Sequence, residues 1–118
     1  MTRRLVAAGW TIFIIVGTLL PKEVISKSGM FGIPHFDKVS HLFAYALLVF
    51  LWSMALNEKT SKIKAARISF YAAIVLGILL EVLQWQLNFG RHFEILDIIA
   101  NIIGSIIGLI AFYKIFKH

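Results

Sequence analysis

Four strongly apolar runs alternate with polar segments along this chain. They cover roughly residues 5–20, 37–56, 68–87 and 97–113. A helix rises about 1.5 Å per residue, so runs of this length come close to crossing the roughly 30 Å hydrocarbon core of a bilayer. The pattern predicts an all-α fold, a four-helix transmembrane bundle built as a single domain over residues 1–118.

The segments between the runs support these boundaries. Pro21 follows the first run and is expected to end its helix. Residues 21–36 contain both prolines and two glycines, which indicates a loop. Arg3 and Arg4 before an apolar run also suit a signal peptide, but no small-x-small cleavage site follows, so we expect a retained helix. The basic run 57–67 is expected to end the second helix.

The composition favours a membrane protein over a soluble one. The chain is 59% hydrophobic and 15% charged, whereas soluble domains average about 45–50% apolar and about 25% charged residues. A domain this small has too much surface to hide that excess from water. The net charge of +6 comes from short basic clusters between apolar runs, which suits anionic headgroups and argues against nucleic acid as a partner. The absence of cysteine excludes disulfides and thiolate metal sites.

The distribution of basic residues predicts the orientation, because cytoplasmic segments are enriched in Lys and Arg. If both termini are cytoplasmic, that side holds Arg3, Arg4, Lys59, Lys62, Lys64, Arg67, Lys114 and Lys117. The outer side then holds only Lys22, Lys27, Lys38 and Arg91. We therefore predict four spans with the N- and C-termini in the cytoplasm.

Polar residues interrupt the apolar runs near their predicted outer ends. Asp37, His41 and Tyr45 are spaced four residues apart and share one face of the second helix. Lys38 lies beside them as an available cationic partner, and Ser40 is the only candidate nucleophile at this depth, without a recognisable nucleophile pattern.

The third and fourth helices bring further polar groups to the same depth. Glu81 lies about 9 Å below the outer end of its helix, and Gln84 shares its face. Arg91 follows in the next turn, and Asn101 lies about 6 Å deeper than Asp97. This convergence predicts a polar pocket near the outer leaflet. Its candidate ligand-binding residues are Asp37, Lys38, His41, Tyr45, Glu81, Gln84, Arg91, Asp97 and Asn101.

Several of these residues also have structural explanations. A carboxylate at the bilayer centre costs about 2.5–3.5 kcal/mol on insertion scales, so Glu81 needs a partner such as Arg91 or a neutral, protonated state. Asp37 and Asp97 begin helices, where an acid caps free N–H groups and suits the helix dipole. His41 is equally explained as a hydrogen-bonded buried histidine or as a catalytic base.

Other roles follow from residue type and spacing. Gln84 and Asn101 are of the kind that joins helices within membranes. Gly104 and Gly108 form a GxxxG pattern, which favours close packing inside the bundle and also allows a homo-oligomer. His41, Glu81 and Asp97 do not follow a known metal-ligand spacing, and no Gly-rich phosphate loop occurs, so no metal or cofactor is expected.

The order of these motifs resembles the VanZ-like family of small integral membrane proteins over roughly residues 10–110. The resemblance rests on Thr18-Leu-Leu-Pro21, Asp37-Lys38-x-x-His41-x-x-x-Tyr45, Glu81-x-x-Gln84, Gly90-Arg91 and Asp97-x-x-x-Asn101-x-x-Gly104. It implies a multi-pass protein of the bacterial cytoplasmic membrane. The family's founding member belongs to a glycopeptide-resistance cluster and is associated with teicoplanin resistance, but many relatives lie outside such clusters.

These observations favour a binding or accessory protein of the cell envelope. The expected partners are membrane lipids, a lipid-linked envelope precursor or a lipophilic glycopeptide. The alternative is a membrane enzyme acting on a phosphorylated or lipid-linked substrate, with Glu81 or His41 as general base, Asp97 as a further catalytic candidate and Arg91 stabilising developing charge. A transporter subunit is a third interpretation, which requires oligomerisation.

Overall fold

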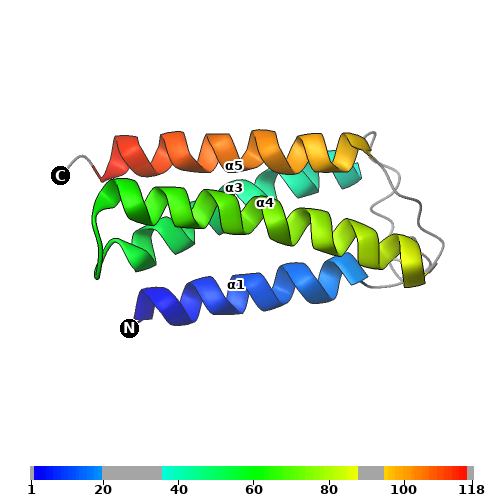
Figure 1. Ribbon diagram of the computed structural model, residues 1–118, viewed down its shortest axis with the longest axis horizontal. Helices are drawn as coiled ribbons and strands as arrows, with labels where there is room; N and C mark the ends of the chain where they lie inside the picture. The colour runs from blue at the N-terminus through cyan, green and yellow to red at the C-terminus, as the bar shows by residue number, and fades with distance from the viewer. Residues whose placement is uncertain (1, 20–35, 88–94, 117–118) are drawn as a thin grey trace.

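The computed structural model describes residues 2–19, 36–87 and 95–116. Within these residues the chain forms the helices α1 (Thr2–Leu19), α3 (Phe36–Leu56), α4 (Lys62–Leu87) and α5 (Ile95–Ile115), and the described part contains no strand (Figure 1). All four are long and apolar enough to cross a membrane. The predicted all-α fold with four membrane-spanning helices is confirmed.

The helices run alternately up and down the long axis of the bundle (Figure 1). The start of α1, the connection between α3 and α4, and the end of α5 lie together at one end, which we call the terminal end. At the other end, the distal end, α1 and α4 finish while α3 and α5 begin. Helix α3 packs against α1, α4 and α5, most extensively against α5. The described residues that were predicted to lie near the outer surface therefore fall at the distal end.

Helix α4 begins at Lys62, earlier than the predicted start near residue 68. The Ser61 hydroxyl accepts a hydrogen bond of 3.2 Å from the backbone N–H of Lys64, which is the geometry of a helix N-cap. The Lys62 Nζ lies 5.0 Å from the ring centre of Tyr113 and donates to its carbonyl oxygen at 3.4 Å. The basic run is therefore partly helical, because long cationic side chains can extend along the end of the bundle while their helix continues.

The GxxxG glycines hold α5 against α3. A Cβ added at Gly104 would overlap the carbonyl oxygen of Leu42, and one added at Gly108 would overlap that of Ala46. The missing side chains let the two backbones approach closely, as small residues do between membrane helices. The motif thus packs inside the bundle, as the sequence favoured.

Helix α1 is joined to α3 by two tryptophans. The Trp10 Nε1 donates to the carbonyl oxygen of Ala44 at 3.0 Å, and the Trp52 Nε1 donates to the Thr11 Oγ1 at 2.8 Å. On the outside of α1, apolar side chains such as Phe13 remain exposed. An apolar exterior with polar contacts between helices is the arrangement expected where lipid replaces water.

Candidate functional site

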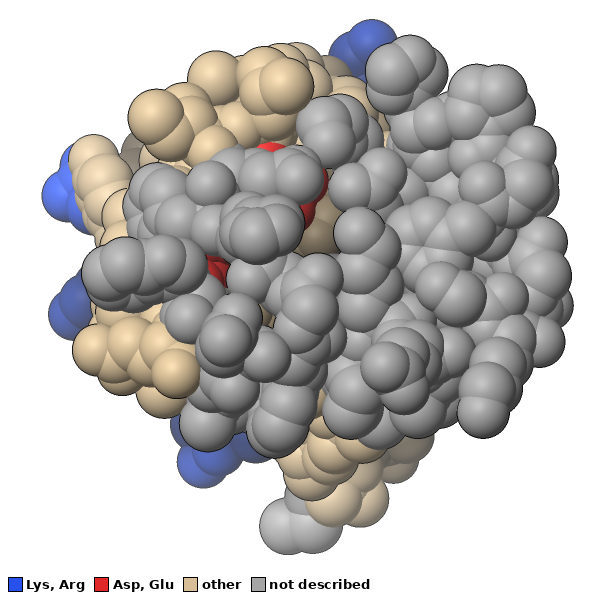
Figure 2. Space-filling view, turned by 90° about the vertical axis from the view of Figure 1, so that its right-hand side faces the viewer, with Lys and Arg blue, Asp and Glu red and all other residues tan. Residues whose placement is uncertain are grey.

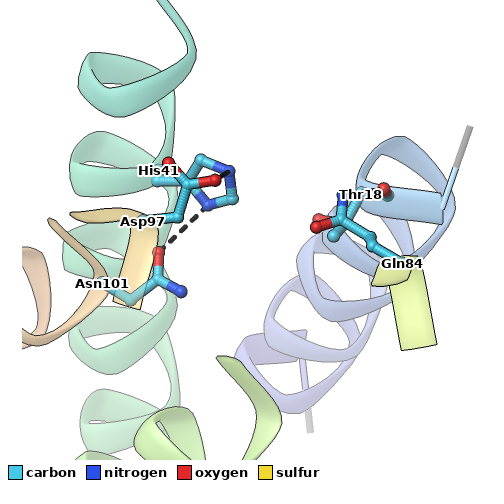
Figure 3. A network of polar contacts seen from close by, with 5 residues as sticks. All are labelled: Thr18, His41, Gln84, Asp97 and Asn101. Atoms are coloured by element: carbon cyan, nitrogen blue, oxygen red, sulfur yellow. Dashed lines mark hydrogen bonds and ion pairs between the residues drawn. The ribbon is translucent and has the colours of Figure 1, made fainter. Parts of the chain in front are cut away.

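His41 of α3 lies between two side chains of α5 at the distal end of the bundle (Figure 3). Its Nδ1 is 3.0 Å from the Asn101 Oδ1, and its Nε2 is 3.9 Å from the Asp97 Oδ2. Asn101 and Asp97 are only 3% and 6% exposed. We call these three residues the distal polar cluster. Asp97 and Asn101 are four residues apart on α5, so the carboxylate and the carboxamide lie one above the other on the same helix face.

The contacts assign a role to each nitrogen of the His41 ring. The Asn101 Oδ1 is an acceptor, so the Nδ1–H of His41 donates to it, and the Nε2 is the nitrogen that faces Asp97. The hydrogen bond to Asn101 therefore orients the ring, and Asp97 lies near its other nitrogen at 3.9 Å. An imidazole held in this way can present a hydrogen-bond donor or acceptor to a bound molecule, or act as a base.

Tyr45 and Glu81 extend the cluster toward α4. The Tyr45 ring stacks on the His41 ring, with centroids 6.4 Å apart and planes inclined by 22°. Tyr45 and Glu81 are each 1% exposed. Three helices thus contribute buried polar side chains at the distal end, since Glu81 belongs to α4.

Asp97 lies in the first turn of α5, two residues after Ile95 begins the helix. A carboxylate in a first turn is stabilised by the helix dipole. The helix-dipole role predicted for Asp97 therefore applies, and the same carboxylate also lies near His41. Asp37 is the second residue of α3, but its side chain lies outside the described residues.

Gln84 lies beside Thr18 of α1 and apart from His41 (Figure 3). Its Nε2 donates to the backbone carbonyl oxygen of Thr18, in the last turn of α1. Gln84 is 3% exposed, so this hydrogen bond satisfies a buried amide while it joins α4 to α1. The contact supports the helix-joining role, and ligand binding by Gln84 stays a prediction.

Figure 2 looks directly at the distal end and shows acidic side chains in its depth. Arg91 and the side chain of Lys38, the predicted cationic part of the pocket, lie outside the described residues. Their contribution to the site stays a prediction.

The sequence profile of the VanZ/LLP1 family matches residues 4–117. The chain belongs to the VanZ/LLP1 family. The match covers every candidate site residue and confirms the resemblance seen in the sequence. Searches among curated proteins and among solved structures found no match.

In this VanZ/LLP1 protein, the described residues contain no cluster of potential metal ligands. No three His, Cys, Asp or Glu side chains of those residues are placed to hold a metal ion together.

Sequence reasoning missed Gly77, which makes room for the cluster. A Cβ at Gly77 would lie 2.8 Å from the Asn101 Nδ2 and 3.3 Å from the Tyr45 Cε2. A signal was available, because Gly77 precedes Glu81 by four residues and so shares its helix face. The glycine lets α4 approach the distal polar cluster of the VanZ/LLP1 fold.

Proposed function

We propose that this VanZ/LLP1 protein binds the polar part of a membrane amphiphile at the distal end of its bundle. The ligand is a membrane lipid, a lipid-linked cell-envelope component or a lipophilic glycopeptide, and the role is accessory to the cell envelope. The observation that carries the proposal is the contact of the half-buried His41 with the buried Asp97 and Asn101, joined by the buried Glu81 from a third helix.

Buried ionisable groups in a membrane segment are costly and commonly mark a functional site. Here they occur at an end of the bundle, within reach of the headgroup region. The amide of Asn101 and the ring of His41 suit hydroxyl, amine or phosphate groups, and Arg91 and Lys38 are predicted to add positive charge for a phosphate or carboxylate. The eight-to-four distribution of basic residues in the sequence predicts that this end lies in the outer leaflet.

Lipid retention by purified protein tests the binding function. The protein is reconstituted in nanodiscs of phosphatidylethanolamine and phosphatidylglycerol, with or without a polyprenyl phosphate, and retained lipid is measured by native mass spectrometry. We expect His41→Ala and Asn101→Ala to lower retention of the preferred lipid at least tenfold.

Ser105→Ala is the matched control for this experiment. Ser105 is a buried polar residue one turn below Asn101, and its hydroxyl donates to the Asn101 backbone carbonyl at 2.8 Å within α5. Its replacement should leave retention unchanged. Equal retention by the wild type, the cluster variants and the control would contradict the proposed function.

A catalytic role has one specific observation in its favour. The His41 ring is oriented by Asn101 and faces a carboxylate, and an imidazole held in a fixed orientation can serve as a general base. Labelled polyprenyl phosphate and phospholipid incubated with the nanodisc protein would yield a product that His41→Ala abolishes. Binding without product after long incubation would count against the enzyme.

A further inference from the structure

An apolar hollow of about 170 Å³ opens between α3 and α5. Its lining combines three small residues, Ala46, Gly108 and Ala111, with large ones that include Phe43, Phe50 and Ile107. The small side chains leave a space that the large ones border. We call this space the α3–α5 hollow.

The surroundings of the hollow show that it faces lipid. Phe43 is 63% exposed and Ile107 43% exposed, and the neighbouring Ile103 and Ile110 are 45% and 50% exposed. All four lie within helices that can span the membrane. The hollow is therefore continuous with the lipid-facing surface. Water would find no polar side chain in its lining, so hydrocarbon is the filling that the chemistry favours.

The hollow and the distal polar cluster belong to the same pair of helices. Along α3, Phe43 follows His41 by two residues. Along α5, Ile107 follows Asn101 by six residues, which is about 9 Å of helix. The cluster lies on the inner side of this helix pair, and the hollow lies on its lipid side, closer to the bilayer centre.

We infer that the α3–α5 hollow holds one acyl chain of a membrane phospholipid whose headgroup lies at the distal end. The hollow is open on its lipid side, and its volume near 170 Å³ suits a segment of one unbranched chain. The location of the headgroup in this inference rests on the proposed function. The ligand would then enter the site from within the bilayer.

Photolabelling in nanodiscs tests this inference. The probe is a phosphatidylglycerol that carries a diazirine in one acyl chain, and adducts are mapped by peptide mass spectrometry. Adducts should concentrate on residues 43–50 and 107–111, at least threefold above the segment of α4 that holds Val75 and Leu79, each 56% exposed. Labelling spread evenly over the lipid-facing surface would overturn the inference.

A variant that fills the α3–α5 hollow tests whether the labelling depends on that space. Ala111→Phe places a ring in the hollow and should lower labelling near Phe43 at least threefold. Ala72→Phe is the matched control, because Ala72 is exposed on α4 outside the hollow lining, and it should leave labelling unchanged. The wild-type map stands as a test even if Ala111→Phe does not fold.

Two further outcomes separate the explanations. If the particle mass shows a dimer and the hollow is protected from label, a second copy covers it and the inference fails. If the hollow is labelled while His41→Ala and Asn101→Ala leave lipid retention unchanged, the chain site stands and the proposed headgroup site fails.

Discussion

Gly77 of α4 faces the carboxamide of Asn101 on α5. A Cβ at position 77 would lie 2.8 Å from the Asn101 Nδ2, closer than side chains normally approach. The same carboxamide contacts His41 through its Oδ1 at 3.0 Å. A residue with no side chain on one helix thus permits a polar contact between two others.

Replacing Gly77 by alanine should disturb the distal polar cluster. The Asn101 carboxamide is the end of a side chain and can turn away from the new methyl group, but it then loses its contact with His41. We expect a destabilisation of about 1–2 kcal/mol, typical of mild overpacking, and lipid retention as low as in Asn101→Ala. Denaturant unfolding in detergent micelles and the nanodisc assay measure the two effects.

Gly9→Ala is the control for this change, because a Cβ there meets nothing within 4 Å. It should be neutral or stabilising by up to about 1 kcal/mol through helix propensity. Equal effects of the two substitutions would contradict the packing role of Gly77.

Gly108→Ala should weaken the whole bundle, because the added Cβ meets a backbone carbonyl, that of Ala46, which cannot turn away. Helices α3 and α5 must then separate, at a cost of about 3 kcal/mol, in the upper part of the usual overpacking range. Thermal unfolding of the purified protein in detergent checks this, with Gly17→Ala, whose Cβ meets nothing within 4 Å, as control. A variant that folds normally but loses a dimer would instead assign the motif to oligomerisation.

Gln84→Leu should separate helix joining from ligand binding. The variant loses the hydrogen bond to the Thr18 carbonyl, and such bonds contribute about 0.6 kcal/mol on average and at most about 1.7 kcal/mol in membrane proteins. We expect a destabilisation in that range with lipid retention unchanged. Retention as low as that of His41→Ala would place Gln84 in the binding site.

The predicted orientation can be measured with single cysteines, because the natural chain has none. Thr60→Cys lies in the connection at the terminal end and should react with a membrane-impermeant maleimide only after the cells are permeabilised. Ser28→Cys, in the predicted outer loop, should react in intact cells. The reverse pattern would place the distal polar cluster on the cytoplasmic side and contradict the outer-leaflet site.

Helical periodicity made part of the site predictable. Asp97 and Asn101 share a face because they are four residues apart, and their depth follows from the start of their helix. His41 reaches the same depth because α3 starts at the same end of the bundle. The depth of Glu81 followed in the same way from the end of α4.

The sequence by itself determined the number of spans, the all-helical class and the layer in which the polar residues lie. Composition and a 3.6-residue period are sufficient for these properties, since a long apolar segment in lipid satisfies its own backbone groups by forming a helix. Only the tertiary structure decided which helices are neighbours. Gln84 contacts Thr18 of α1, whereas Asn101 contacts His41, because packing at Gly104 and Gly108 places α5 against α3. That choice depends on the close fit of backbones, which no spacing along a single helix expresses.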